Sequence, residues 1–404
     1  MILQIDCPPS YPPGFKLVFV GKAPGEEEVK ERSGFAGASG KCLARACSVA
    51  GLDWSSCAKT NVAKRRSPDN KFRDCFYEII EEPIYTKTGK LSKKTKKVER
   101  KTQELQEWEY ALQIELKEQN PNLVVACGNE AMEAITGLKG ITDYRGSIIL
   151  DKWGNGHKVL AVEHPSFIIR GNPERFWILA RDLQKAKREM EFPEIRREPY
   201  NAFTKPDKDY IFYALNWLRN NPQVKWTLDI ETRAGTLACF AIAWRGLPIR
   251  LQNETIQDYI SVCIPIQTTS GPYWTVEEEL EIWRTLRATT LANPNLCNQN
   301  IEYDLYYLLH YGVEPSGIWM DTMLAHSILY QEFPKDLGFL GSFYLDDVAW
   351  WKDDHREWSG RTPDEALWEY CCKDAVYTLR IVEKIDKELK RRGLFKAYHG
   401  ENRL

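Results

Sequence analysis

The chain has 404 residues, which is enough for two or three domains with hydrophobic cores of their own. Hydrophobic residues make up 43% of it and charged residues 28%, as in an ordinary globular protein. The net charge of −2 excludes a basic field over the whole chain, although a local cationic patch is still possible. No apolar stretch is long enough to span a bilayer and the N-terminus is not a signal peptide, so no membrane partner is expected.

Eleven cysteines are scattered along the chain, and none forms a Cys-x-x-Cys pair. A zinc site or a redox motif is therefore not expected. Many of the cysteines lie in apolar runs, which is typical of small buried side chains. This usage fits a protein of a reducing cytoplasm.

The first half of the chain alternates short apolar strands with helices. We expect strands at 17–20, 123–126 and 159–162, and helices at 42–50, 130–135 and 176–190. Glycine or polar residues follow the strands, as they do where a strand runs into a loop. The pattern predicts a three-layer α/β domain.

Four loops in this half carry polar and aromatic side chains at expected strand ends: 21–28, 34–40, 60–64 and 164–166. Such loops can converge on one edge of a sheet. Together they resemble the uracil-DNA glycosylase superfamily, most closely its family 4, over residues 15–190. The resemblance implies that Phe35 stacks on an extruded base, that Asn61 reads the base edge, and that His164 stabilises charge on the departing uracil. Glu28 matches an acidic position near the attacking water.

Two positions depart from the pattern of this family. Lys22 stands where the family has an acid, directly after the first glycine of its loop, and a cation there cannot activate water. The segment 64–66 reads Lys-Arg-Arg where the family has a cysteine of its iron–sulfur cluster, so we expect no such cluster. Two interpretations remain open: a glycosylase, or a glycosylase-like fold kept as a DNA-binding or structural domain.

Residues 87–101 contain eight lysines and arginines and a single acid, Glu99. Such a run predicts a solvated loop. It is also the best electrostatic candidate for contacts with DNA phosphates, which we assign to Lys93, Lys94, Lys96 and Lys97.

Prolines and mixed charges after residue 190 mark a linker. We therefore divide the chain into a glycosylase-like domain at 1–195, a linker at 196–208 and a second domain at 209–404. In the second domain, apolar strands are expected at 224–230, 237–244 and 260–264, ahead of mostly helical sequence.

Three short acidic motifs follow in the second domain. Asp229 and Glu231 are two residues apart on an expected strand and project to the same side of it. Joined by Asp304 and Asp374, they can hold two Mg²⁺ or Mn²⁺ ions, as phosphodiester hydrolysis requires. Tyr370 lies one helical turn before Asp374, where its phenol can orient the attacking water.

These motifs resemble the 3′–5′ exonuclease domain of family A DNA polymerases, within the DEDD superfamily. The matching blocks are TLDIET at 227–232, NQNIEYD at 298–304, DTML at 321–324 and YCCKDA at 370–375. The resemblance covers residues 205–400 and implies a ribonuclease H-like fold, with a mixed sheet and flanking helices. It also implies that the four carboxylates bind metal, that Tyr370 marks the tyrosine subtype, and that Asn300 supports the substrate strand.

Two functions remain open for the whole chain. The first is a metal-dependent exonuclease that proofreads 3′ single-stranded ends at a primer–template. Because the chain ends at Leu404 without room for a polymerase body, we expect the front portion of a longer family A polymerase, as in some bacteriophage replicases, in the cytoplasm of a bacterium or phage-infected cell. The second is a DNA-binding accessory module that recognises uracil without cutting.

Overall fold

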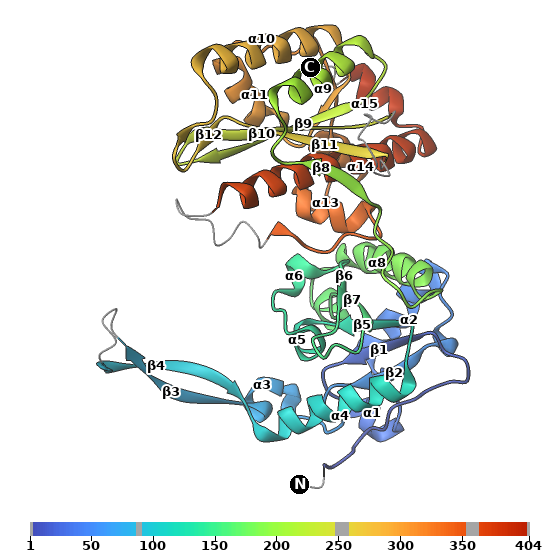
Figure 1. The fold of residues 1–404 in the computed structure, drawn as a ribbon. Coiled ribbons are helices and arrows are strands. Elements are labelled where there is room, and N and C mark those ends of the chain that lie inside the picture. The colour runs from blue at the N-terminus through green and yellow to red at the C-terminus, as the bar shows by residue number, and fades with distance from the viewer. Residues whose placement is uncertain (1–2, 86–90, 247–257, 353–362, 402–404) are drawn as a thin grey trace. The chain divides into compact units, whose positions relative to one another are not determined.

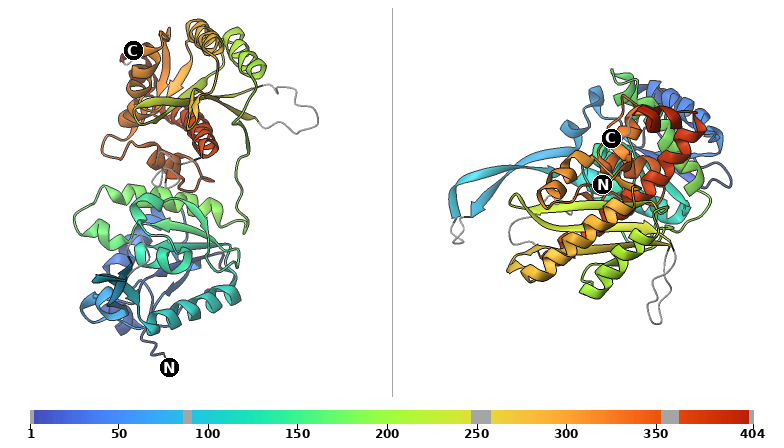
Figure 2. Two further views of the ribbon diagram at one scale, coloured as in Figure 1. Left: turned by 60° about the vertical axis from the view of Figure 1, so that its left-hand side comes forward. Right: turned by 90° about the horizontal axis from the view of Figure 1, so that it is seen from above.

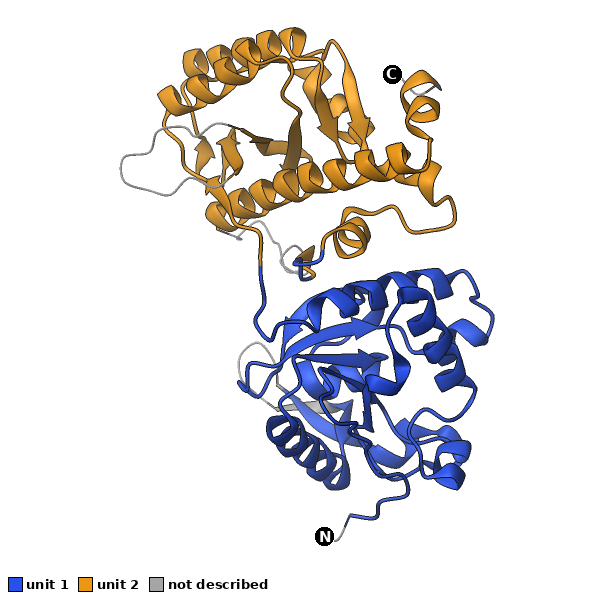
Figure 3. Ribbon diagram, turned by 90° about the vertical axis from the view of Figure 1, so that its right-hand side faces the viewer, with its two compact units in different colours: residues 1–196, 346–349 blue, residues 197–345, 350–404 orange. Residues whose placement is uncertain are grey.

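The computed structural model describes residues 3–85, 91–246, 258–352 and 363–401 (Figure 1). The chain folds into two compact units (Figure 3). Unit 1 consists of residues 1–196 and 346–349, and unit 2 of residues 197–345 and 350–404. Among the described residues, no helix has both the length and the apolar character needed to cross a membrane.

Unit 1 is built on a five-stranded sheet of order β2-β1-β5-β7-β6, in which only β6 runs antiparallel to its neighbour. Its elements are β1 (Leu17–Gly21), α1 (Glu26–Glu31), α2 (Ala38–Ala50), β2 (Ala58–Asn61), α3 (Phe72–Phe76), β3 (Tyr77–Tyr85), β4 (Leu91–Lys101), α4 (Gln103–Gln119), β5 (Leu123–Cys127), α5 (Asn129–Thr136), α6 (Ile141–Tyr144), β6 (Ile148–Leu150), β7 (Lys158–Val162), α7 (Pro165–Ile169) and α8 (Arg175–Glu189).

Every residue of β1, β5 and β7 is buried, as expected for parallel strands covered on both faces. Leu17 and Phe19 of β1 join one core with apolar residues of α2 and α8, such as Leu43 and Leu183. The side chains between them on the strand point to the opposite face, since side chains alternate along a strand. The three-layer α/β domain predicted for the first half is confirmed.

The basic run is not the solvated loop that we expected. Residues 91–101 form β4, which pairs antiparallel with β3 in a two-stranded hairpin (Figure 1). Glu81 lies opposite Lys97 and Glu82 opposite Lys96. Opposite charges that face each other across two strands favour the pairing, and this explains why so charged a segment is extended.

Unit 2 is built on a six-stranded mixed sheet of order β15-β14-β9-β10-β11-β8. Its elements are β8 (Tyr200–Phe203), α9 (Lys208–Asn220), β9 (Trp226–Arg233), β10 (Thr236–Arg245), β11 (Tyr259–Pro265), β12 (Gln267–Thr268), β13 (Gly271–Pro272), α10 (Val276–Ala292), β14 (Leu296–Asn298), α11 (Ile301–His310), β15 (Ile318–Asp321), α12 (Thr322–Leu329), α13 (Leu337–Tyr344), α14 (Asp364–Arg391) and α15 (Phe395–Glu401).

Helices cover both faces of this sheet, as the predicted fold class requires. Large side chains of β9 and β10, such as Trp226 and Phe240, pack with α9 and α10 on one face. Small side chains, such as Cys239 and Ala241, pack against the long helix α14 on the other face. Figures 1 and 2 show α14 lying along the sheet. Small residues on that face let α14 approach the sheet closely.

The stretch expected to be a linker contains an element of unit 2. Residues Tyr200–Phe203 form β8, which pairs in parallel with β11 at the edge of the sheet. Tyr200 lies opposite Tyr259 in this pairing. A four-residue strand with one hydrogen-bonded neighbour leaves almost no periodic signal, and the prolines around it dominate the sequence pattern.

Candidate active sites

The first candidate site is in unit 2, where β9 meets α14. Asp229 and Glu231 share the face of β9 that α14 covers, and Asp229 lies opposite the small side chain of Ala241. Thr227, two residues earlier on the same face, donates its Oγ1 hydrogen to the carbonyl of Ala375 in α14, at 2.8 Å. This bond places the last acidic motif beside the first.

The four predicted carboxylates line one pocket of about 310 Å³. Oxygens of Asp229, Glu231 and Asp374 lie within 4.8 Å of one another, and Asp304 lies outside this group of three. Asp304 enters the pocket from α11 and is only 3% exposed. Its Oδ1 atom is buried and has no hydrogen-bond partner among the described residues. A buried, unpaired carboxylate oxygen beside three other acids fits a site for hard divalent cations.

Burial and mutual repulsion shape the charge of this pocket. Burial raises the pKa of Asp229 well above its ordinary value, and the charges of Asp374 and Glu231 raise it further. The pKa of Glu231 is raised by burial and then by Asp374, and that of Asp304 chiefly by burial. A bound cation relieves the repulsion that keeps these groups protonated.

Two residues that the sequence reasoning missed bind Asp374 directly. Trp351 donates its indole hydrogen to Oδ1 at 2.6 Å, and Lys352 donates to Oδ2 at 2.5 Å. Lys352 also donates to the hydroxyl of Tyr370 at 2.8 Å. Burial lowers the pKa of Lys352, but Asp374 and the other carboxylates outweigh it and raise the pKa overall, so the ammonium stays charged. No spacing rule links a lysine to an acid 22 residues away.

Tyr370 is buried on α14, one turn before Asp374, as the sequence predicted. Burial raises the pKa of its phenol, and the charge of Asp374 raises it further. The side chain therefore stays protonated and can donate its hydrogen. With Lys352 donating to the same oxygen, the phenol is held in place on the wall of the pocket.

Asn300 also lines this pocket and stands before α11 with a left-handed backbone (φ 59°). The backbone N–H groups of Asn300 and Ile301 donate to the carboxylate of Asp321, at 3.2 and 2.9 Å. The same carboxylate accepts from the amide of Met323 at the start of α12. Asp321, the first residue of the DTML block, thus fixes where α11 begins and so positions Asn300 and Asp304. The DTML block was part of the predicted resemblance, but no role was predicted for Asp321.

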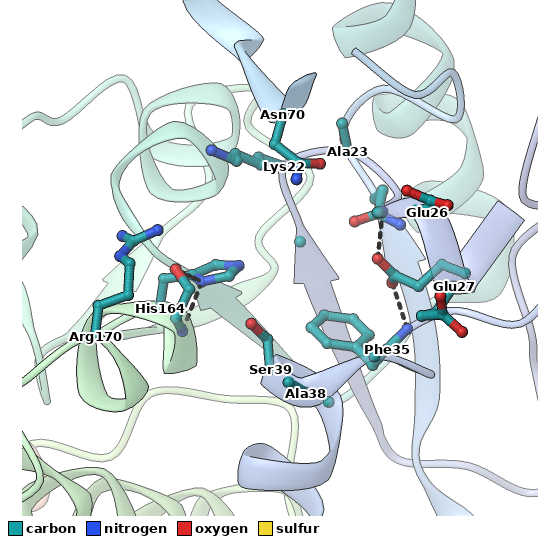
Figure 4. Close-up of a pocket in the computed structure, with 17 residues that line it drawn as sticks. Lys22, Ala23, Glu26, Glu27, Phe35, Ala38, Ser39, Asn70, His164 and Arg170 are labelled. Carbon is teal, nitrogen blue, oxygen red and sulfur yellow. Dashed lines mark hydrogen bonds between the residues drawn. The ribbon is translucent and has the colours of Figure 1, made fainter. Parts of the chain in front are cut away.

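The second candidate site is a pocket of about 280 Å³ in unit 1 (Figure 4). It brings together all five residues of the predicted glycosylase-like pocket: Lys22, Glu28, Phe35, Asn61 and His164. They come from the ends of β1, β2 and β7 and from the segments that follow. The carboxyl ends of parallel strands meet at one edge of a sheet, which explains why loops distant in sequence converge here.

Two glycines, which have no side chain, let neighbouring residues of this pocket pack closely against the backbone. A Cβ at Gly21 would collide with the amide oxygen of Asn61, and a Cβ at Gly40 would collide with the carbonyl of Phe35. Phe35 itself has a left-handed backbone (φ 61°), which is uncommon for a bulky residue. The position of the aromatic ring is thus set by the surrounding backbone.

Glu28 lines the pocket and binds the backbone beside it. Its two carboxylate oxygens accept hydrogen bonds from the backbone amides of Gly25 and Phe35, each at 2.5 Å. The side chain therefore closes the first turn of α1 and holds the strained backbone of Phe35. These backbone contacts were not predicted, and the place of Glu28 near an attacking water stays a prediction.

His164 is a neutral group in this pocket. Its Nδ1 accepts a hydrogen bond from the amide of Ser166 at 3.1 Å, so the proton of the neutral ring resides on Nε2. Burial lowers the pKa of His164 to about 4, helped by the charges of Lys22 and Arg170. The ring can therefore donate a hydrogen bond at neutral pH without carrying a charge.

The segment that replaces the cysteine region of the glycosylase family is a buried ionic corner. The ammonium of Lys64 lies 2.7 Å from the carbonyl of Asn61 and 2.7 Å from a carboxylate oxygen of Glu115. Arg65 forms a two-pronged ion pair with Glu104. Carboxylates and a carbonyl satisfy these cations, and the same contact fixes the backbone of Asn61 at the pocket.

The predicted phosphate-binding lysines lie on β4. Lys96 and Lys97 are exposed, each opposite a glutamate of β3, so part of their charge is compensated. The side chains of Lys93 and Lys94 lie outside the described residues. Neither Lys96 nor Lys97 lines the glycosylase-like pocket.

Comparison with known proteins assigns the two units to separate families. Residues 8–187 match the uracil DNA glycosylase superfamily, and residues 240–390 match a 3′–5′ exonuclease family. The first match spans the five pocket residues. The second contains Asp304, Tyr370, Lys352 and Asp374, while Asp229 and Glu231 precede it.

Individual relatives agree with the first match. A type-4 uracil-DNA glycosylase of Thermotoga maritima is 29% identical over 175 residues, which cover 43% of this chain and 76% of the relative. The corresponding protein of Archaeoglobus fulgidus is 29% identical over 160 residues, which cover 38% and 67%.

Two solved structures are similar over part of the chain. A mutant of the catalytic core of RRP6 from Trypanosoma brucei has a TM-score of 0.34 and 14% identity, covering 51% of this chain and 54% of that one. A nuclease in its apo form has a TM-score of 0.28 and 17% identity, covering 44% and 79%. From the family matches, the chain contains a domain of the uracil DNA glycosylase superfamily followed by a 3′–5′ exonuclease domain.

Proposed function

We propose that this protein removes nucleotides from the 3′ ends of DNA with the help of two divalent cations bound in the carboxylate pocket of unit 2. The observation that carries the proposal is the convergence of four acids and a protonated tyrosine in one pocket. Three of the acids have raised pKa values, and this is an arrangement that is unfavourable without a cation.

Asp229, Glu231 and Asp374 would hold one cation between them, and Asp304 would share the second with Asp229. When bound, two Mg²⁺ or Mn²⁺ ions lower the pKa of a water and offset charge on the attacking and leaving oxygens. Carboxylate oxygens suit either ion, and none of the described residues lining the pocket is a histidine or cysteine that would favour a softer metal.

The chain's own groups orient the reactants. Tyr370 keeps its proton and donates a hydrogen bond, so it positions the attacking water instead of acting as a base. Lys352 donates hydrogen bonds to both Tyr370 and Asp374 and so fixes their positions relative to each other. The backbone of Asn300 is fixed by Asp321, and its side-chain amide faces the DNA strand. Its position at the pocket wall suits a hydrogen bond to a sugar or phosphate oxygen.

For unit 1 we propose DNA binding at the glycosylase-like pocket, with slow or no uracil excision. Phe35, Asn61 and His164 provide a ring for stacking, an amide for reading a base edge and a neutral hydrogen-bond donor. Phe167 and Ile169, which are 43% and 50% exposed, follow His164 on α7 and could wedge between neighbouring bases. Lys22 stands where the resembled family has an acid, and the carboxylate of Glu28 is bonded to the backbone, so neither residue is free to activate water. The hairpin lysines would add salt-sensitive affinity for phosphates.

A proofreading role is the narrower form of this proposal. It rests on the resemblance of the acidic motifs to the exonuclease domain of family A DNA polymerases, whose partner would be a polymerase body and a primer–template. The alternative is a DNA-binding accessory module without nuclease activity. The four acids of the pocket favour the first over the second.

The test is degradation of a 5′-labelled single strand of DNA by the full chain. We expect a ladder of shortened products with Mg²⁺ or Mn²⁺ and none with EDTA. Replacing both Asp229 and Glu231 by alanine should lower the rate by at least about 1,000-fold, because the cations then lose their main ligands. Metal binding should be lost in parallel when followed by calorimetry.

A matched control is Glu281→Ala, which removes an exposed acid from the outer face of α10. It should leave both the rate and metal binding unchanged. If the unmodified chain leaves a 3′ single strand intact at saturating Mg²⁺ and Mn²⁺, the exonuclease proposal is wrong.

A further inference from the structure

The exposed side of α11 carries large apolar side chains that no core uses. Tyr303, Tyr306 and Leu309 are 46%, 70% and 53% exposed. They are spaced three residues apart and therefore form a continuous band on the helix, which we call the α11 stripe. Contiguous exposed apolar surface of this kind marks an interaction site more often than single exposed residues do.

The stripe begins at the carboxylate pocket. Tyr303 lines that pocket, and its hydroxyl lies 3.2 Å from the hydroxyl of Thr232, the residue after Glu231. Tyr306 and Leu309 follow along the helix, away from its start at Ile301. A ligand with one end among the carboxylates can thus cover the stripe with its next segment.

The tyrosines of the stripe are supported from below. Tyr307 packs against the main core of unit 2, with its ring centroid 5.4 Å from Tyr303 and 5.2 Å from Tyr306. The rings of Tyr306 and Tyr307 are nearly perpendicular, at 89°. Perpendicular rings do not cover each other face to face, so the aromatic face of Tyr306 is available to another flat ring.

The charges of α11 indicate which part of a DNA strand would meet the stripe. The helix contains no lysine or arginine, and Glu302 is exposed beside the stripe. Phosphates are repelled by that carboxylate, whereas bases present a flat face that stacks on an aromatic ring whatever the sequence. Three helical residues advance by about 4.5 Å, somewhat more than the ~3.4 Å between stacked bases of one strand. Successive bases can therefore reach successive side chains of the stripe when the strand is slightly stretched.

We propose that the α11 stripe binds single-stranded DNA just before its 3′-terminal nucleotide, with the second or third base from the end stacked on Tyr306. The inference rests on the exonuclease function proposed above and adds a binding site to it. It makes the enzyme prefer single-stranded ends of at least three nucleotides, because a paired base cannot leave its partner to stack on the helix. The affinity it adds comes from stacking and not from ion pairs.

The binding experiment uses the full chain and a ten-nucleotide thymidine strand in which one of the last four bases is 2-aminopurine. Ca²⁺ replaces Mg²⁺, and a phosphorothioate at the last linkage slows hydrolysis. We expect binding to quench the fluorescence most at the second or third base from the 3′ end. Tyr306→Ala should abolish that position-specific quenching and weaken binding about tenfold, and Tyr306→Phe should preserve both. The fold loss should be the same at low and high salt, since no ion pair is removed.

The control is Tyr213→Ala, which removes a 49% exposed tyrosine from α9 in the same unit and should change nothing. With Mg²⁺, Tyr306→Ala should raise KM for a ten-nucleotide strand about tenfold and raise it less for a dinucleotide, because a dinucleotide lacks the third base from the 3′ end. Unchanged quenching and KM in Tyr306→Ala would overturn the inference. The same result is expected if the α11 stripe binds another protein or a second copy of this chain instead of DNA. Failure of the exonuclease proposal would look different: the unmodified chain would cleave neither substrate, while the quenching would still report on the stripe.

Discussion

The two pockets differ in how much of their charge is already neutralised by the protein. In unit 1, both oxygens of Glu28 are bonded to backbone amides, and His164 is neutral. In unit 2, Asp229 and Glu231 face each other's charge, and Asp304 has a buried oxygen without a partner among the described residues. The carboxylate of Glu28 and the ring of His164 in the first pocket thus carry no unsatisfied negative charge, whereas the second pocket needs a ligand of opposite charge.

This difference in charge leads us to expect that the pocket of unit 1 binds a substrate and that the pocket of unit 2 reacts with one. A carboxylate that accepts hydrogen bonds from backbone amides fixes the shape of the pocket. To activate a water molecule it would have to give up those bonds, and the shape would change. Uncompensated charge in a buried pocket is unfavourable for folding and is retained where a cation or a reaction uses it. We therefore expect chemistry in unit 2 and recognition in unit 1, and three experiments can test this contrast.

The largest effect is expected from giving unit 1 an acid. In a chain whose exonuclease is inactivated at Asp229 and Glu231, we expect little or no abasic product from a uracil-containing strand. Lys22→Asp should then raise uracil excision by about 100-fold, because a carboxylate after Gly21 can act as a general base. The measurement is alkaline cleavage of the abasic product. Lys22→Met, which removes the cation without supplying a base, is the matched control and should give little gain.

Rapid excision by the chain with native Lys22, lost on Asn61→Ala, would contradict the contrast drawn here. It would mean that another group in the pocket activates water.

A smaller effect is expected from removing the phenol of Tyr370. Tyr370→Phe should slow turnover by about 10- to 100-fold, because the attacking water loses a hydrogen bond that orients it. Metal affinity measured by calorimetry should stay the same, because in the proposed mechanism Tyr370 orients water and only the carboxylates bind the ions. A parallel loss of metal binding would show that Tyr370 has been misplaced in the site.

The smallest effect concerns stability. Because the pKa of Asp229 is raised in the folded state, the folded chain holds its proton more tightly than the unfolded chain does. Without metal, this group therefore favours folding least at high pH, and its unfavourable contribution grows as the pH rises above its unfolded pKa of about 3.9. In EDTA at pH 8, Asp229→Asn should stabilise unit 2 by about 0.5–2 kcal/mol, and by less near pH 4.

The readout is denaturant unfolding followed at both pH values, with Glu281→Gln as the control for loss of an exposed acid. Saturating Mg²⁺ should cancel the gain, because the native carboxylate then binds a cation. A destabilised Asp229→Asn variant in EDTA would mean that the repulsion inferred at this site is absent.

Much of the architecture could be predicted from local sequence. Apolar runs such as 123–126 and 159–162 correspond to β5 and β7, because a strand buried on both faces has no polar positions to hide its pattern. The carboxylates of the second half converge because each lies at a point that strand or helix periodicity fixes. Asp229 and Glu231 share one face of a strand, and Tyr370 and Asp374 share one face of a helix.

What could not be predicted depends on partners distant in the chain. Residues 91–101 are extended because β3 supplies opposite charges across the hairpin, and no local pattern reveals that pairing. Lys352 and Trp351 reach Asp374 only through the folded chain. The backbone contacts of Glu28 were missed for the opposite reason: they are local capping contacts, and the prediction for this residue came from the family resemblance alone.

The close approach of Gly40 to Phe35 has a consequence for how unit 1 can change over evolutionary time. Any side chain at position 40 would displace the carbonyl of Phe35, and with it the aromatic wall of the pocket. Position 22 carries no such constraint, because its side chain extends into the pocket and holds no backbone in place (Figure 4). A substitution at position 22 can thus alter reactivity without disturbing the fold, while a substitution at position 40 alters the shape of the pocket. A lineage can lose its catalytic step in one mutation and keep a base-shaped cavity long afterwards.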